Sequence, residues 1–578
     1  MNAPLLTRLA RRILRFGLPA GIAFLLFIPV RALVLPQTAV PGAVRIAADG
    51  PVLPGHPKIQ SSLTRLLEIE RTQGAEAAAA YARQRKMDWR DGRVRVVTLA
   101  ENIGGLQTAA LTTAAIRQRV EALGGVVETT YRRLVQHTIP PAALETLADD
   151  PLIKYVRLPL KPFPQAVVSE GVAITGADLW KNLEAFRVAD PAKVCILDVG
   201  FDGYQNLLGS DLPKTVTTRS FRWDGDINGG GEQHGAACAE IVYDMAPNAK
   251  MYLVNIETDV EQHQAVDWIV SQGVDVISYS LGWFNSGAGD GTGPIDDDVE
   301  YAASQGLAWA SSAGNSAQDH WTGKFYDPDG NGYMNFDSTG TEILTFHVPA
   351  YETVGAFLNW KDWGPYNGYD YRGSDQDYDF ELYFLDGATW QFVYSSTDFQ
   401  TGTQWPTEDI YGWYARIKGT WGVKIKKISV TPAKANIDLE IFVMGNDEAL
   451  QYYNSARSVL VPADSPSAWA AGATDAGVGG LGPTDSLHYY SGRGPTWDGR
   501  MKPDFTAPSG VSTTTYGNNN FYGTSASAPH LAGAIALLKG MTPYSIAQIK
   551  TILIKRALDL GVPGPDNLYG YGRISVKK

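Results

Sequence analysis

The spacing of apolar residues between positions 93 and 160 predicts a small domain in which strands and helices alternate. Strands are expected where apolar and polar residues alternate, and helices where apolar residues recur every three or four positions. The predicted strands are 94–99, 126–131, 134–139 and 153–158, and the predicted helices are 108–123 and 141–149. This order, strand-helix-strand-strand-helix-strand, is that of a ferredoxin-like domain.

Beyond Lys193 the pattern changes to short, continuously apolar strands separated by helices. Such strands are typical of a parallel sheet that helices cover on both faces. The predicted strands are 194–197, 274–279 and 307–311, and the predicted helices are 235–244, 262–272, 298–305 and 527–538. We therefore expect an α/β fold for this part of the chain.

A third pattern, alternation with Gly, Asp and Pro turns between the strands, occupies residues 343–447. The predicted strands there include 380–384, 391–394, 414–417 and 439–443. This pattern indicates an all-β sandwich inserted into the α/β domain.

The first 34 residues are predicted to be a signal peptide or an N-terminal anchor. An uncharged stretch, 16–30, follows four basic residues: Arg8, Arg11, Arg12 and Arg15. This arrangement is typical of a secretory signal, since a membrane span needs about 20 apolar residues. We therefore expect a secreted protein, with membrane contact only if this segment is retained. Residues 35–92, which begin with a stretch rich in Pro, Gly and Ala, are expected to be a linker.

The composition fits packed globular domains, because 44% of the residues are hydrophobic and 19% are charged. The formal net charge is -12 and no basic run occurs, which excludes the electrostatic footprint of a nucleic-acid-binding protein. The chain has 2 cysteines, Cys195 and Cys238. They are too few for a disulfide framework or a four-thiolate zinc site, so we expect both to be buried packing groups.

Three segments carry residues with nucleophilic or acid–base chemistry. Asp198 follows a predicted strand, at the carboxyl end where ligand groups gather in open α/β sheets. His234 opens a predicted helix of small residues. Ser525 precedes an apolar helix, so its backbone N–H would face an oxyanion that the helix dipole stabilises. A turn or cap explains Asp198 or His234 alone, whereas the Ser525 segment favours a nucleophile.

Together these segments resemble those of the subtilisin-like serine proteases (subtilases), whose triad follows the chain order Asp, His, Ser. The matching runs lie within 194–200, 233–240 and 523–530. Ala236, where the family usually has threonine, and Ala526-Ser527 depart from the family pattern, but neither departure removes a reacting atom. Further matching segments are 275–282, 312–315, 493–495 and 502–508. The resemblance covers about residues 170–325 and 455–578, and it implies the subtilisin-like form of the α/β fold.

The resemblance implies a serine endopeptidase and a role for each matched residue. Ser525 would attack the peptide carbonyl to form an acyl-enzyme, His234 would move the proton, and Asp198 would orient the imidazole. The side-chain amide of Asn315 would donate to the oxyanion. No cofactor is expected for catalysis.

The same resemblance implies where a substrate would bind. Its backbone would pair with a strand edge formed by Ser280, Leu281 and Gly282. The specificity pocket would lie between that edge and a second segment: Ser312, Ala313 and Gly314. We therefore expect protein or peptide substrates.

In subtilases a ferredoxin-like domain is often a propeptide that chaperones the catalytic domain and blocks its cleft. The resemblance therefore implies that residues 93–165 are an intramolecular inhibitor removed by self-cleavage, although a permanent binding domain fits the same pattern. The catalytic domain would comprise 166–342 and 448–578, with 343–447 as the inserted module. Two other functions stay open: a catalytically degenerate binding or adhesion protein on this fold, and a peptide ligase or cyclase.

One loop has the spacing of a calcium site. Asp327, Asp329 and Asn331 place oxygen-bearing side chains at alternate positions before a glycine turn, as in the first half of an EF-hand loop. Position twelve is Ser338 instead of Glu, and the same spacing is typical of a solvated turn. Structural calcium is common in secreted subtilases, so we expect calcium as a structural ligand.

Overall fold

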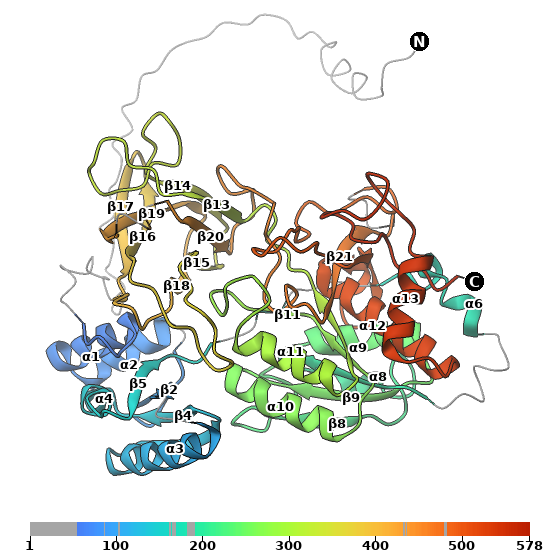
Figure 1. Cartoon of the computed structure of the whole chain (residues 1–578), viewed down its shortest axis with the longest axis horizontal. Helices are drawn as coiled ribbons and strands as arrows, with labels where there is room; N and C mark the ends of the chain where they lie inside the picture. The colour runs from blue at the N-terminus through green and yellow to red at the C-terminus, as the bar shows by residue number, and fades with distance from the viewer. Residues whose placement is uncertain are drawn as a thin grey trace, which may run out of the picture. The chain divides into compact units, whose positions relative to one another are not determined.

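The computed structural model describes residues 55–85, 87–101, 105–160, 163–164, 169–181, 191–431, 434, 436–478 and 482–577. Figure 1 follows its elements along the chain by colour. The predicted signal or anchor, residues 1–34, lies outside the described residues. None of the helices in the described part has the length and apolar character that a membrane crossing requires.

A seven-stranded parallel sheet is the centre of the α/β part, as the sequence predicts. Its strand order is β22-β21-β12-β10-β7-β9-β8. The strands are β7 (Lys193–Asp198), β8 (Thr217–Ser220), β9 (Lys250–Asn255), β10 (Val276–Tyr279), β12 (Ala308–Ser312), β21 (Ala468–Asp475) and β22 (Phe505–Ser509). From β7 the chain passes to the edge strand β8, returns to β9 beside β7, and then crosses to β10, from which it runs outward to the other edge. The carboxyl ends of β7 and β10 therefore form a switch point, where open α/β sheets place their ligands.

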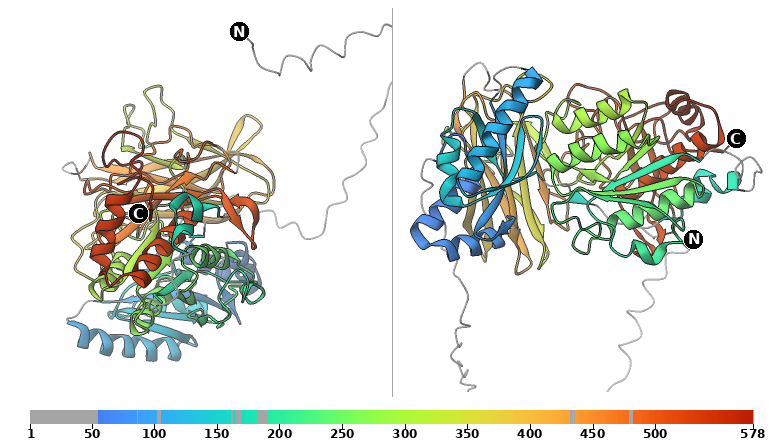
Figure 2. Two further views of the ribbon diagram at one scale, coloured as in Figure 1. Left: turned by 90° about the vertical axis from the view of Figure 1, so that its right-hand side faces the viewer. Right: turned by 90° about the horizontal axis from the view of Figure 1, so that it is seen from below.

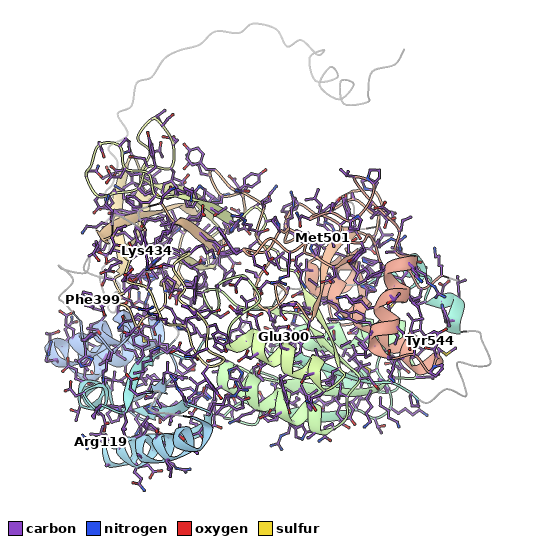
Figure 3. All side chains as sticks on the ribbon, viewed as in Figure 1. Arg119, Glu300, Phe399, Lys434, Met501 and Tyr544 are labelled. Carbon is purple, nitrogen blue, oxygen red and sulfur yellow. The ribbon has the colours of Figure 1, made fainter. Side chains whose placement is uncertain are left out.

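Alternate residues of β7 enter two different hydrophobic cores, which is why helices cover both faces of the sheet. Val194 and Ile196 pack in the core that α9 (His234–Met245) and α12 (Thr524–Met541) complete. Cys195 and Leu197 pack in the core that α10 (Asp259–Ser271) and α11 (Pro294–Ser304) complete. Figure 2 shows these layers from two further directions, and Figure 3 shows the side chains that fill the space between them.

The N-terminal domain has the predicted ferredoxin-like topology, with β5, β2, β4 and β3 side by side in that order. Its elements are β1 (Trp89–Arg90), β2 (Arg93–Ala100), α3 (Gly105–Ala122), β3 (Val126–Tyr131), β4 (Leu134–Ile139), η2 (Pro141–Ala143), α4 (Leu144–Ala148) and β5 (Ile153–Arg157). The helix expected at 141–149 is thus split into a 3₁₀ turn and a short α-helix.

Two helices precede this sheet where the sequence led us to expect a linker, so the linker prediction for 35–92 is wrong over its second half. They are α1 (Ser61–Gln73) and α2 (Ala75–Gln84). The first buries Leu63, Leu66, Leu67 and Ile69 in the core of the N-terminal domain, and the second buries Ala78 and Ala82 there. The apolar residues of α1 are few and the buried residues of α2 are alanines, so the Pro/Gly/Ala-rich segment before them obscured the helical period.

The inserted β-sandwich consists of two four-stranded antiparallel sheets, β13-β20-β15-β18 and β14-β19-β16-β17. Its strands are β13 (His320–Lys324), β14 (Leu344–Val348), β15 (Thr353–Trp360), β16 (Asp377–Asp386), β17 (Thr389–Ser396), β18 (Thr407–Tyr414), β19 (Gly419–Ser429) and β20 (Asp438–Met444). The module therefore begins at β13 and not at 343. The strand expected at 414–417 is also wrong, because these residues turn between β18 and β19, and Ile417 is 63% exposed.

Candidate active site

Asp198 and His234 form a buried pair at the carboxyl end of β7. The His234 ring nitrogen Nδ1 lies 2.8 Å and 2.9 Å from the two carboxylate oxygens of Asp198. The carboxylate is oriented by the Val199 N–H, which donates to Oδ1 at 2.8 Å. Gly235 allows α9 to approach the strand, because a Cβ there would lie 2.6 Å from the Gly200 carbonyl oxygen. The strand end and the helix start thus hold the imidazole against a fixed carboxylate.

Ser525 is the second residue of α12 and is fully buried. Its Oγ donates to the carbonyl oxygen of Ser280 at 3.2 Å, and the Ser280 Oγ donates to the carbonyl oxygen of Ser525 at 3.0 Å. The Cys238 Sγ lies 3.7 Å from that same Ser525 oxygen and within 4.8 Å of ligand atoms of Asp198 and His234. The packing of α9 on α12 therefore brings the three predicted triad residues to one place.

The grouping of Asp198, His234 and Cys238 also has the composition of a metal site, but the thiol does not fit that role. Burial is the largest cause that raises the pKa of Cys238 well above its ordinary value, and the Asp198 charge raises it further. A metal ligand or nucleophile requires the thiolate. Both cysteines are free and buried, which is the packing role that the sequence predicts.

Two N–H donors lie at the start of α12, where a negatively charged oxygen would be stabilised. The Asn315 Oδ1 accepts from the N–H and the Oγ of Thr524, each at 2.8 Å, so the amide nitrogen faces the opposite way. A Cβ placed on Gly523 would lie 2.9 Å from the Asn315 Nδ2 and 3.6 Å from the Ser525 N. Gly523 has φ 132°, which favours glycine, and its lack of a side chain leaves space beside both nitrogens.

The predicted substrate edge is paired with a segment of the same chain. β11 (Leu281–Gly282) forms antiparallel bridges with β6 (Phe163–Pro164), with Leu281 opposite Pro164 and Gly282 opposite Phe163. This segment follows the N-terminal domain in the chain. The edge therefore accepts an extended peptide backbone, as a substrate-binding strand would.

Of the other predicted pocket residues, Ser312 contacts this edge and Gly314 contacts the start of α12. The Ser312 Oγ donates to the Leu281 carbonyl oxygen at 3.4 Å, and the Gly314 N–H donates to the Thr524 Oγ1 at 3.1 Å. Ala313, which stands between these two residues in the chain, is buried.

The Leu460 side chain lies between the two predicted pocket walls, a position that no sequence pattern predicted. A Cβ on Gly282 or on Gly314 would lie 2.8 Å from the Leu460 side chain. Leu460 belongs to no motif and follows the inserted sandwich, so only the folded chain brings it to the two glycines. The Leu460 side chain would therefore narrow the predicted specificity pocket.

The N-terminal domain meets the catalytic part through a fully buried arginine. The Arg95 guanidinium lies 2.7 Å from Glu261 and 3.0 Å from Glu257 on the catalytic side, and 2.6 Å from Glu128 in its own domain. A charge this deeply buried requires such partners.

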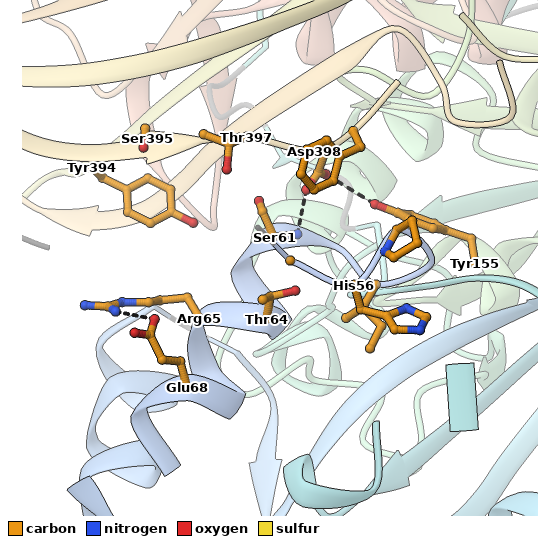
Figure 4. A pocket seen from close by; sticks show the side chains of 14 residues that line it. His56, Ser61, Thr64, Arg65, Glu68, Tyr155, Tyr394, Ser395, Thr397 and Asp398 are labelled. Carbon is orange, nitrogen blue, oxygen red and sulfur yellow. Dashed lines mark hydrogen bonds and ion pairs between the residues drawn. The ribbon is translucent and has the colours of Figure 1, made fainter. Parts of the chain in front are cut away.

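The sandwich contacts both neighbouring parts. Phe284, just after β11, stacks on Phe357 with ring centroids 4.5 Å apart. On the other side Asp398 accepts from the Ser61 N–H and the Tyr155 hydroxyl of the N-terminal domain (Figure 4). The Arg85 guanidinium lies over the rings of Tyr394 and Trp413 at 4.4 Å and 4.3 Å from their centroids.

The predicted calcium loop forms hydrogen bonds of its own. Asp327 accepts from the Gly330 and Gly332 N–H groups, and its Oδ2 lies 3.1 Å from the Lys427 ammonium. The Asn331 amide donates to Asp329 at 3.1 Å. These contacts agree with the solvated turn, and an ammonium group beside Asp327 fits poorly with a divalent cation. Calcium at these three residues stays a prediction.

A sequence model described as the subtilase family matches residues 190–355 and 403–572, together more than half of the chain. An extracellular serine protease of Serratia marcescens is 46% identical over 63 residues, 11% of this chain and 6% of that protein. The minor extracellular protease Vpr of Bacillus subtilis is 36% identical over 103 residues, 15% of this chain and 13% of that protein. The aligned stretches are thus small parts of these relatives.

Two solved structures of proteases also align with this chain. The Clostridium perfringens CspB protease aligns with 71% of this chain and 98% of its own, at 16% identity and a TM-score of 0.47. Fervidolysin from Fervidobacterium pennivorans, described as a keratinolytic enzyme related to subtilisin, aligns with 85% of this chain and 61% of its own, at 15% identity and a TM-score of 0.42.

Proposed function

Because the chain belongs to the subtilase family, we propose that it is a serine endopeptidase that hydrolyses peptide bonds of proteins or peptides through an acyl-enzyme. The observation that carries the proposal is the buried Asp198–His234 pair beside Ser525 at the start of α12. The N–H donors beside Gly523 support the same reaction. A binding protein that had lost catalysis would have no need to keep these groups together.

In the proposed mechanism, the Ser525 Oγ attacks the peptide carbonyl carbon while the His234 Nε2 takes the hydroxyl proton. Asp198 accepts a hydrogen bond from the His234 Nδ1–H and stabilises the imidazolium that forms. The carbonyl oxygen becomes negative and accepts hydrogen bonds from the Ser525 N–H and the Asn315 amide. His234 then gives its proton to the leaving amine, and water releases the acyl group by the same steps in reverse.

The N-terminal domain is proposed to act as an intramolecular inhibitor. The pairing of β6 with β11 supports this, because it covers the edge that a substrate would use. Arg95 binds the N-terminal domain to the catalytic part, and the contacts of Asp398 and Arg85 bind it to the sandwich. Both sets of contacts would keep the inhibitor in place. The basic N-terminus followed by an uncharged stretch supports secretion, with membrane contact only if that segment is retained.

A fluorophosphonate probe tests the proposed nucleophile directly. The chain freed of its N-terminal domain is expected to form one covalent adduct, on the peptide that contains Ser525, because the base and oxyanion donors activate that hydroxyl. Mass spectrometry of the digested protein locates the adduct. Ser525→Ala is expected to abolish it, whereas Ser527→Ala, which removes a buried hydroxyl that donates to the Ala507 carbonyl, is expected to keep it. A folded, freed chain that remains unlabelled would contradict the proposal.

Leu460 leads to a prediction about specificity. Because its side chain fills the pocket, the enzyme is expected to prefer a small residue on the carbonyl side of the cleaved bond. Leu460→Ala is expected to raise kcat/KM for Leu or Phe at that position at least about 10-fold relative to Ala, since a few methylene groups are worth about 10- to 200-fold in such pockets. Cleavage of a peptide library measures the preference. Val459→Ala, whose side chain packs with Ala463 and Ala470 instead, should leave it unchanged.

A further inference from the structure

Two buried carboxylates lie beside the loop that joins β11 to α11, away from the proposed triad. Asp296 is in the first turn of α11, and Asp464 is in the segment that leads into β21; each is 1% exposed. Glu300, which Figure 3 labels, ties the two elements together, because it accepts from the Ser465 and Ser467 hydroxyls at 2.6 Å and 2.7 Å. The two acidic side chains are therefore held close to one another by the fold.

Three oxygens of these carboxylates have no hydrogen-bond partner among the described residues. They are both oxygens of Asp296 and the Oδ1 of Asp464. The Asp464 Oδ2 accepts from the Gly291 N–H at 2.9 Å. Burial raises the pKa of Asp296 well above its ordinary value, and the Asp464 charge raises it further. Buried carboxylates without partners are costly, so this pair requires either a shared proton or a cation.

A small space ringed by oxygens adjoins Asp296. A Cβ on Gly293 would lie 3.1 to 3.4 Å from the Tyr371 hydroxyl, the Asp296 Oδ2 and the Ser286 carbonyl oxygen. A Cβ on Gly287 would lie 3.0 to 3.5 Å from the Thr292 carbonyl oxygen, the same Asp296 oxygen and the Tyr371 hydroxyl. Because both residues are glycines, no Cβ lies beside these oxygens; among them, the Tyr371 hydroxyl donates to the Thr292 carbonyl oxygen.

Two cationic side chains beside the loop bond to other groups. The Arg500 guanidinium donates to the main-chain oxygens of Asp464 and Asp290, each at 2.6 Å. Lys361 donates to the main-chain oxygen of Ala288 in the loop at 3.2 Å and lies 2.9 Å from the carboxylate of Glu440. Neither of these contacts neutralises the carboxylate of Asp296.

We propose that this loop binds a calcium ion through the carboxylates of Asp296 and Asp464 and the main-chain oxygens of Ser286 and Thr292, with the Tyr371 hydroxyl beside it. Calcium takes six to eight oxygen ligands in flexible geometry, which an oxygen-only set from a loop and two carboxylates suits. Zinc and other transition metals favour nitrogen or sulfur ligands, and none is among the donors named here.

The ion would link the substrate edge to the segment that carries Leu460. The loop begins directly after β11, and Asp464 follows Leu460 by four positions in the chain. A cation shared by these segments would therefore hold the substrate edge against the pocket-filling residue. The proposal concerns binding alone, so its outcome is separate from that of the proposed peptidase activity.

Calcium titration of the full-length Ser525→Ala chain tests the site without self-digestion. One equivalent of calcium is expected to bind, and saturating calcium is expected to raise Tm by about 4 °C or more over the value in chelator. Terbium, a luminescent substitute for calcium, should emit when the aromatic side chains are excited, because Tyr371 adjoins the site. Asp296→Asn and Gly287→Ala should each remove this binding event and the Tm shift; the second adds one methyl group and keeps both carboxylates.

Two further variants distinguish this site from others. Asp297→Asn alters the neighbouring carboxylate, which accepts from the Tyr366 hydroxyl at 2.6 Å, and Asp327→Asn alters the other candidate loop. Both variants should keep the calcium-binding event that Asp296→Asn abolishes. Binding that survives in Asp296→Asn and Gly287→Ala would overturn the proposal, and so would a chain that binds no calcium, because the carboxylates then share a proton. If Asp296→Asn does not fold, Gly287→Ala alone decides.

Discussion

Alanine at Ser525 is expected to lower kcat/KM for a peptide substrate about 10⁶-fold, and alanine at His234 is expected to cost as much. The double variant should lose no more than either single one, because the two groups act as one unit; the size and the non-additivity are those known for subtilisin itself. Asn at Asp198 is expected to cost about 10⁴-fold, since it leaves the imidazole in the wrong tautomer.

To compare these rates, the N-terminal domain must have been removed from every variant. Replacing residues 161–168 with the recognition sequence of another protease allows the N-terminal domain to be removed even from inactive chains. Cys238→Ala is the matched control: its thiol lies 3.7 Å from the Ser525 carbonyl oxygen but stays protonated, so activity should remain within about tenfold. A loss of 10⁴-fold or more in that variant, with Ser525→Ala still active, would make the cysteine the nucleophile.

The sequence predicted the elements whose periodicity is long and local. Continuous apolar runs such as Val194–Leu197 fit only a strand buried on both faces, and alternating runs such as 126–131 fix which residues face a core. The helices α1 and α2 were missed because they are stabilised by burial of a few leucines and alanines in a core that later residues complete. The first sandwich strand, β13, was missed because its pairing partner, β20, is far along the chain.

The same contrast holds for the site. Asp198, His234, Asn315 and Ser525 each lie in a short motif whose local structure aims the side chain, so the sequence alone selected them. Leu460, Asp296 and Asp464 act through neighbours that are distant in sequence, and no local pattern marks them. Leu460 packs against Gly282 and Gly314, and Asp296 lies beside Gly287 and Gly293. Asp464 accepts from the Gly291 N–H.

The chain is expected to cut itself after Gln165, which the strand register favours, or after Ala166, the small residue that a pocket filled by Leu460 favours. Pro164 is opposite Leu281 and Phe163 is opposite Gly282. If the segment keeps this register during cleavage, the next residue expected to pair, with Ser280, is Gln165. The Ser280 carbonyl oxygen accepts from the proposed nucleophile at 3.2 Å. Mass spectrometry of the purified chain should find this cut, at a first-order rate that does not depend on protein concentration. Ser525→Ala should accumulate uncut; equal cutting of that variant in a pure preparation would assign the processing to another protease.

After the cut, the N-terminal fragment is expected to remain bound as an inhibitor. Arg95→Met should weaken its inhibition about 10²- to 10³-fold, because Glu261, which is 1% exposed, is left as an unpaired buried charge, at a cost of about 3–5 kcal/mol. Arg93→Met is the matched control, since that guanidinium donates to the Gly124 carbonyl oxygen within its own domain. The measurement is the inhibition constant of each fragment on the mature enzyme, with circular dichroism to show that the fragments are folded. If a folded fragment does not inhibit, the β6–β11 pairing is too weak to exclude a substrate. The N-terminal domain is then a permanent binding domain and not an inhibitor.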